Sequence, residues 1–188
     1  MRTSTRLKPP ATDAGQSMIE LALILPFLLV LTLGVADVGR ALLFNNILTH
    51  MSREGANLAS RTSQSPAFII NTLNQTAAPL DMATQGMGIL SRVKAIDGGS
   101  GTVITVVFEQ YRAINGKTSL LSKLWVCPSW ASNGVCNLPA AASSRAVTLP
   151  FTLALGYEVN IMETIYDYTP LTNFVLKTSP ELYARTFL

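Results

Sequence analysis

Residues 21–36 read Leu-Ala-Leu-Ile-Leu-Pro-Phe-Leu-Leu-Val-Leu-Thr-Leu-Gly-Val-Ala and contain no charged side chain. With its flanks, the apolar span runs from Met18 to Val38. As an α-helix rising about 1.5 Å per residue, such a span measures about 30 Å, which is the thickness of the hydrocarbon core of a bilayer. No second run of this length occurs in the chain. The sequence therefore predicts a single membrane crossing.

The composition of the 188 residues agrees with a membrane-anchored chain. Only 13% of the residues are charged and 48% are hydrophobic, which excludes a disordered chain. The net charge of +3 comes without a stripe of Lys and Arg, so no nucleic-acid partner is expected. One His and two Cys are too few for the usual His-rich or Cys-rich metal sites. We expect no metal and no cofactor.

Basic residues around the apolar span predict its orientation. Arg2, Arg6 and Lys8 precede the span, whereas Arg40 and Arg53 follow it closely. Because cytoplasmic flanks carry the excess of Lys and Arg, we expect a cytoplasmic N-terminus and an extracytoplasmic C-terminal part. The alternative is a cleaved secretory signal that ends at the small residues 34–36 and leaves a mature chain starting at Asp37.

Two residues of the span are unusual for a membrane helix. Glu20 stands at its beginning, where the carboxylate either reaches the lipid headgroups or is buried and pairs with a cation. Pro26 removes one backbone N–H and is expected to kink the helix, which membrane helices tolerate.

Residues 15–39 together resemble the N-terminal region of type IV pilins and pseudopilins. Gly15 is followed five positions later by Glu20 and then by an apolar run with an early Pro26. The order of features is most similar to TadE-like proteins of tight-adherence (Flp) pilus systems. Residues 52–59 and 157–171 are similar to later segments of such chains. Major Flp pilins carry Glu-Tyr where this chain has Glu20-Leu21, which favours a minor pilin or pseudopilin-type component.

The resemblance implies specific roles for the N-terminal residues. A prepilin peptidase would cut between Gly15 and Gln16, which makes Glu20 the fifth mature residue. In pilin assemblies this Glu pairs with the α-amino group of a neighbouring subunit, so two charges that are costly in lipid neutralise each other. The implied partners are the inner membrane, other pilus or pseudopilin subunits, the assembly machinery and the peptidase. The implied function is assembly of the pilus and surface attachment.

The chain is expected to fold as an α+β protein of pilin-like architecture, with four successive regions. These are a basic leader (1–15), a transmembrane helix (16–38), a helix extension (39–62) and an extracytoplasmic α+β domain (63–188). The extension carries apolar residues at helical spacing, which predicts one packed face. This face is formed by Leu43, Phe44, Ile47, Leu48, Met51, Gly55, Leu58 and Ala59.

The extracytoplasmic part predicts a small antiparallel sheet packed against the long helix. A short helix is expected over 67–73, and a hairpin of strands 90–96 and 102–111 around a Gly-rich turn. Further strands are expected over 147–155, 156–168 and 182–188. The alternation slips near Met162, which predicts either a β-bulge or burial on both sides.

The cysteines, Cys127 and Cys136, lie in one loop with Trp125 and Trp130 beside them. In an oxidising compartment a disulfide is the expected state. No arrangement of residues indicates catalysis: His50 is the only His, and Glu158 and Glu163 are expected on opposite faces of a strand, solvated rather than paired. The alternative to pilus assembly is an anchored or secreted binding domain that uses the loop of Trp125 and Trp130.

Overall fold

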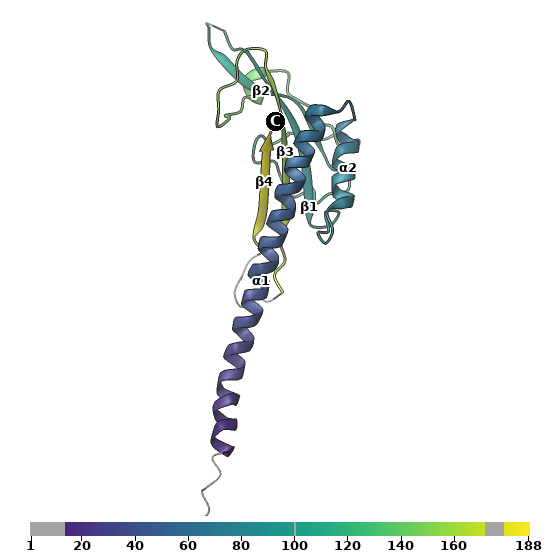
Figure 1. Cartoon of the computed structure of the whole chain (residues 1–188). Coiled ribbons are helices and arrows are strands. Elements are labelled where there is room, and N and C mark those ends of the chain that lie inside the picture. Colours follow the sequence, from purple (N-terminus) through teal and green to yellow (C-terminus); the bar gives the residue numbers. More distant parts are fainter. Residues whose placement is uncertain (1–13, 100, 172–178) are drawn as a thin grey trace, which may run out of the picture.

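A single helix, α1 (Ala14–Arg61), runs for 48 residues and projects far beyond the rest of the chain (Figure 1). The computed structural model describes residues 14–99, 101–171 and 179–188. The predicted continuity between the apolar span and the amphipathic extension is confirmed, because α1 has no break between them. The described part of the domain packs mainly against the C-terminal half of this helix, from residue 44 to residue 59.

A second helix, α2 (Pro66–Thr76), follows after a short polar link. Ser65 caps it: the Phe68 backbone N–H donates to Ser65 Oγ at 3.3 Å, and Pro66 occupies the first turn, where its missing N–H costs nothing. The helix buries Ile69, Ile70 and Leu73. It covers the expected 67–73 segment and continues one turn further.

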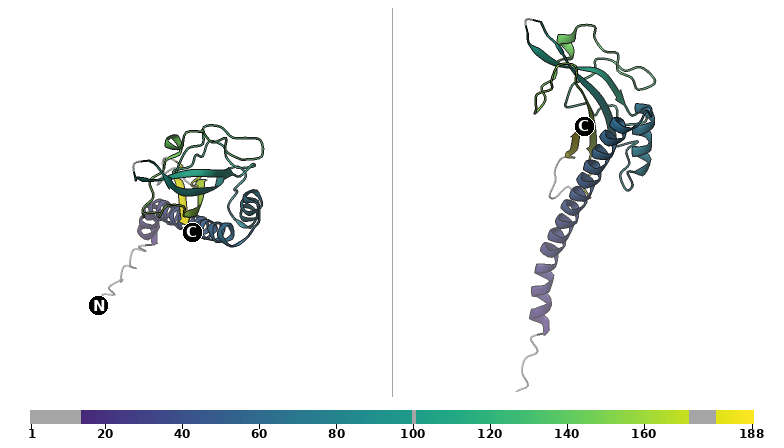
Figure 2. Two further views of the ribbon diagram at one scale, coloured as in Figure 1. Left: turned by 90° about the horizontal axis from the view of Figure 1, so that it is seen from above. Right: turned by 45° about the horizontal axis from the view of Figure 1, so that its top comes forward.

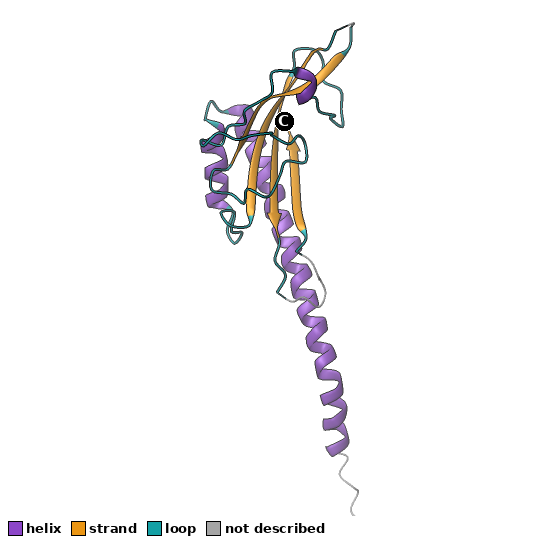
Figure 3. Ribbon diagram, turned by 180° about the vertical axis from the view of Figure 1, so that it is seen from behind, coloured by secondary structure: helices purple, strands orange, loops and turns teal. Residues whose placement is uncertain are grey.

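Four antiparallel strands form one sheet in the order β2-β1-β3-β4 (Figure 3). They are β1 (Gly86–Asp97), β2 (Val103–Arg112), β3 (Glu158–Asp167) and β4 (Glu181–Phe187). The predicted hairpin is confirmed as β1–β2. Its turn includes Gly99 and Gly101 at φ of 91° and 76°, values that favour glycine. The α+β class and the antiparallel sheet are therefore as the sequence predicted.

The sheet lies between a layer of helices and a layer of loops (Figure 2). On one face α1 packs against β3 and β4, while α2 packs beside it against β1 and β2. The main core fills this interface and includes Leu48 of α1, Leu73 of α2 and Met162 of β3. On the other face, residues of the 113–157 region cover a smaller core of Val93, Val107, Val159 and Ile161. Both faces of the sheet are thus buried.

The predicted strand over 147–155 is wrong. The segment touches the edge of β2 at one isolated bridge, where the Val147 N–H donates to the Thr105 carbonyl at 2.9 Å, and then turns away. Pro150 has no N–H to continue a ladder. The apolar residues Val147, Leu149 and Leu153 pack against the smaller core instead, which explains why they resembled a strand.

The slip in alternation at Met162 reflects burial on both sides of β3. Residues 161–166 are all buried, because α1 covers one face of the strand and loops cover the other. The pairing of β3 with β1 and β4 is regular through this point. A register shift occurs instead between Arg92 and Val93, where β1 pairs with β2.

Candidate functional site

The N-terminal half of α1 presents an apolar surface that the described residues leave almost entirely exposed. Of the described residues, the helix is the one candidate to cross a membrane by length and composition. Its large side chains from Met18 to Val38 are exposed nearly throughout. One face forms a shallow groove with helical spacing, lined by Phe27, Val30, Leu31, Gly34, Val35 and Val38. Such a surface fits lipid or another apolar helix.

The residues singled out at the N-terminus lie on the first turns of this helix. Gly15 and Gln16 are in the opening turn of α1, and Glu20 follows one turn later with an exposed side chain. Pro26 lies inside the helix, which remains α-helical through it. The leader residues Arg2, Arg6 and Lys8 lie outside the described residues. The structure therefore places the expected cleavage site and Glu20 on one continuous helix.

A buried acid, Asp37, marks the point where the domain meets the apolar half of α1. Its side chain is fully buried, and the Leu171 N–H donates to Asp37 Oδ1 at 2.6 Å. Tyr168 donates its hydroxyl to the Asp37 carbonyl at 3.0 Å. One turn along, the Arg40 guanidinium lies 5.5 Å from the centre of the Phe44 ring. These contacts tie the segment after β3 to the helix.

The surroundings of this junction raise the pKa of Tyr168. Burial raises the pKa of its phenol above the usual value, and the nearby Asp37 carboxylate raises it further. Arg40, which lies 6.0 Å from the Tyr168 ring centre, offsets part of the increase in pKa. The neutral phenol is therefore the stable form. From the sequence, Asp37 is predicted only as a possible new N-terminus. The signal for its buried role is an acid at the end of an apolar run, three residues before Arg40.

Glu163 is buried, and the expectation that it is a solvated strand residue is wrong. Its carboxylate accepts hydrogen bonds from the backbone N–H groups of Lys123 and Leu124, both at 3.1 Å, and from the Tyr183 hydroxyl at 2.6 Å. The Ser122 hydroxyl is a further close partner. These donors compensate for the burial of the charge. Glu163 thus anchors the 122–124 turn to β3 and β4.

Glu158, in contrast, is exposed and forms an ion pair with Lys94 at 2.8 Å. The two acids therefore do not form a pair that could act together on a substrate. Burial raises the pKa of Tyr183 well above its usual range, and the adjacent Glu163 carboxylate contributes. These effects stabilise the fold and need no ligand to explain them.

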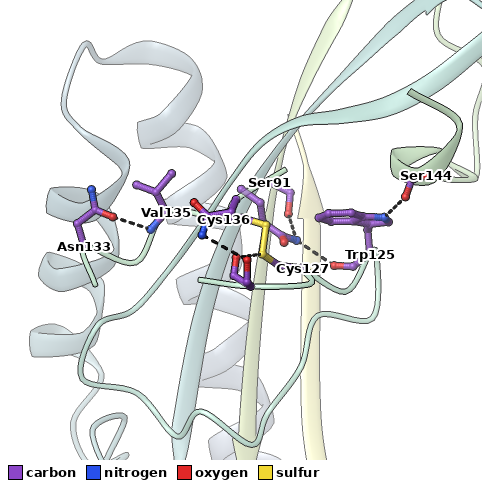
Figure 4. Close-up of a disulfide and its surroundings, with 10 residues drawn as sticks. Ser91, Trp125, Cys127, Asn133, Val135, Cys136 and Ser144 are labelled. Atoms are coloured by element: carbon purple, nitrogen blue, oxygen red, sulfur yellow. Dashed lines mark hydrogen bonds between the residues drawn. A yellow bond between two sulfur atoms is a disulfide. The ribbon is translucent and has the colours of Figure 1, made fainter. Parts of the chain in front are cut away.

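Cys127 and Cys136 form a disulfide in the loop layer (Figure 4). The loop is also held by the sheet: the Cys136 N–H donates to the Gln110 carbonyl at 2.9 Å, and the buried Gln110 amide donates to Ser91 Oγ and to the Trp125 carbonyl. The Trp125 indole N–H donates to the Ser144 carbonyl at 2.9 Å. The loop is therefore fixed on the sheet.

The two tryptophans are partly buried. Trp125 packs against the smaller core. Trp130 packs against the main core. The Arg112 guanidinium lies over the Trp130 ring, 4.8 Å from the ring centre. Their main contacts are therefore within the domain, although each keeps some exposed surface.

A second apolar groove lies at the end of the sheet farthest from the apolar half of α1. It is formed where the start of β2 meets the 146–153 segment, and Val103 and Phe151 are its exposed apolar residues. Tyr157 is also exposed at this end of the sheet, where its carbonyl accepts from Ala95.

Within the described part of the chain, no three His, Cys, Asp or Glu residues come together as a set that could hold a metal ion. His50 lies on the exposed face of α1. Chemically, the described arrangement offers apolar surfaces, one acid at the start of a helix, and a loop layer held by a disulfide and by hydrogen bonds to the sheet.

These features define a class of protein: an α+β chain in which a long N-terminal helix carries a sheet on one half and could span a membrane with the other. A comparison with protein families adds a similarity that lies on the helix itself. The family model described as "TadE-like protein" matches residues 15–57. The matched region starts at Gly15 and ends within the buried part of α1, so the resemblance drawn from residues 15–39 is confirmed. It associates the chain with the tight-adherence (Tad) pilus system.

The match does not extend to the sheet. The similarity drawn for residues 157–171 lies outside the matched region and stays a prediction. Searches among curated proteins and among solved structures found no match.

Proposed function

We propose that this chain is a minor pilin or pseudopilin-type structural component of a tight-adherence (Flp) pilus, needed for pilus assembly and surface attachment. The observation that carries the proposal is the TadE-like match over residues 15–57, which falls on a helix with one exposed apolar half and one half packed on a domain. An apolar helix of this kind can leave a bilayer only by packing against other apolar helices.

The proposed processing step is cleavage between Gly15 and Gln16 by a prepilin peptidase. Cleavage would leave a cationic α-amino group at Gln16, one helical turn from Glu20. In an assembly the Glu20 carboxylate would pair with the α-amino group of a neighbouring copy or subunit. Pairing removes the cost of holding two separate charges in lipid, and so favours one axial register between neighbouring helices.

The proposed location is the inner membrane, with a cytoplasmic N-terminus, a single crossing and an extracytoplasmic domain. The proposed partners are the peptidase, the assembly machinery and other pilus or pseudopilin subunits. The disulfide between Cys127 and Cys136 supports an oxidising compartment for the domain. We propose a structural role rather than a catalytic one.

A second candidate function is an anchored or secreted binding domain outside any pilus. The observation that favours it is the apolar groove at the far end of the sheet, between the start of β2 and residues 146–153, with Phe151 exposed. The loop of Trp125 and Trp130 is a weaker candidate, because both rings are packed against the domain.

The test is the mature N-terminus of the protein, determined by mass spectrometry of membrane fractions. We expect a start at Gln16, and we expect a Gly15→Leu variant to keep its leader. A start at Asp37 would remove Glu20 and the span and would favour the secreted binding domain. A start at Met1 or Arg2 in the unmodified chain would contradict prepilin-type processing.

A further inference from the structure

The apolar surface of α1 continues beyond the predicted membrane span, onto the base of the domain. Val38, the last residue of the span, is 47% exposed, and Leu42 and Leu43 beyond it are 61% and 50% exposed. Leu171, whose N–H is bound to Asp37, is 58% exposed and lies at the same level of the helix. We call these four residues the apolar collar.

The position of the collar follows from the length of the helix. At about 1.5 Å per residue, Asp37 lies about 26 Å along the axis from Glu20, and Leu42 lies about 33 Å from it. If Glu20 is at one interface of a hydrocarbon layer about 30 Å thick, the other interface falls between Asp37 and Leu42. The turn that carries Leu171 is therefore at the depth of the lipid headgroups and upper acyl chains.

The polar groups of this turn suit such a depth. Asp37 is fully buried and accepts from the Leu171 N–H, and the Tyr168 hydroxyl donates to the Asp37 carbonyl. Arg40 lies against the buried rings of Phe44 and Tyr168, which hold its charge close to the domain. Asp37 and the Tyr168 hydroxyl thus have hydrogen-bond partners within the chain. The side chains of Leu42, Leu43 and Leu171 are exposed.

From these observations we propose that the collar of Val38, Leu42, Leu43 and Leu171 is a lipid-binding surface that seats the base of the domain in the outer interface of the bilayer. The proposal rests on the proposed membrane anchorage. The chosen partner is lipid because the collar is continuous with the apolar span below it. The domain would then be held at a fixed height and rotation by two contacts, the helix and the turn at Leu171.

The test uses the full chain in nanodiscs of phosphatidylethanolamine and phosphatidylglycerol, with a spin label at one introduced cysteine. The label sites are Leu171→Cys and Leu42→Cys for the collar, Leu29→Cys for the middle of the span, and Leu155→Cys as a control. Leu155 is 57% exposed, like Leu171, but lies near Ala95 at the opposite end of the sheet. The unmodified chain, whose two cysteines form a disulfide, should take up no label.

We expect labels at Leu171 and Leu42 to be relaxed several-fold more by oxygen, relative to a water-soluble nickel complex, than the label at Leu155. A water-exposed label at Leu171 with a lipid-exposed label at Leu29 would overturn the collar and leave the anchorage intact. Shielding of Leu171 from both reagents would overturn it in favour of a protein contact. A water-exposed label at Leu29 would overturn the anchorage itself, and the collar with it.

Discussion

The two halves of α1 contain similar apolar residues and have opposite environments. In the N-terminal half leucines such as Leu29 are exposed, whereas in the C-terminal half Leu48 is completely buried. The difference lies in the pattern: residues 21–36 are apolar on every side, while residues 44–59 confine their buried residues to one stripe and place Arg53, Glu54 and Asn57 opposite. An all-round apolar helix needs an apolar surrounding, and a striped helix needs one packed partner. The spacing of the apolar residues along a helix therefore predicts its surroundings better than their number does.

The largest expected effect is a loss of piliation when an acid is removed from the N-terminal half of α1 but not from its C-terminal half. Replacing Glu20 with Ala should abolish piliation without preventing membrane insertion, because the substitution removes the carboxylate proposed to pair with a neighbouring α-amino group. Glu54→Ala is the matched control, an exposed acid on the packed half of the same helix. Electron microscopy of pili and membrane fractionation measure the two outcomes. Normal piliation in Glu20→Ala would sink the proposed role of Glu20.

The next largest effect is on the stability of the domain, which should depend on leucines of the C-terminal half of α1 and not on those of the N-terminal half. Leu48→Ala should lower the free energy of unfolding of the domain by about 2–5 kcal/mol, because it opens a cavity between α1 and the sheet. Leu29→Ala should change the same quantity by less than about 0.5 kcal/mol. Denaturant unfolding of the full chain in detergent micelles, followed by near-ultraviolet circular dichroism, gives both values. Equal losses in the two variants would break the distinction between the halves.

Two glycines of α1 offer a smaller and opposite pair of effects. A Cβ added at Gly55 would lie 2.7 Å from Leu73 Cδ1 and 2.8 Å from Met162 Cγ, whereas one added at Gly39 would meet nothing within 4 Å. Gly55→Ala should therefore destabilise the domain by about 1–3 kcal/mol. Gly39→Ala should leave it unchanged or stabilise it by up to about 1 kcal/mol through helix propensity. Thermal unfolding in micelles tests the signs, and stabilisation by Gly55→Ala would contradict the close packing.

The smallest effect concerns the junction between the halves and depends on pH. Because the pKa of Tyr168 is raised in the folded chain, its contribution to stability is complete below the unfolded pKa of about 10 and is lost as pH rises through the folded value. Tyr168→Phe removes a hydroxyl bond worth about 1 kcal/mol near neutral pH. The difference in unfolding free energy between the two chains should shrink above about pH 10. A difference that stays constant at alkaline pH would show that the phenol is not held in its neutral form.

The sequence predicted what depends on local pattern. The continuous helix, the hairpin at Asp97–Gly101 and the stripe of Phe44, Leu48 and Met51 were predicted from periodicity and turn residues, and the structure confirms them. Leu43 was included in that stripe and is exposed, because it lies at the edge of the packed face. The pattern of residues 147–155 predicts a strand that does not form, because apolar residues that cover a sheet alternate much as those within one do.

Sequence by itself determined that α1 is a helix with an apolar half, since hydrophobic period and length act over a few neighbouring residues. Only the tertiary structure decided the roles of Asp37 and Glu163. Each acid lies in an apolar context, and its partners come from distant positions: Leu171 and Tyr168 for Asp37, Lys123, Leu124 and Tyr183 for Glu163. Whether a buried carboxylate is stable depends on donors that the fold brings to it.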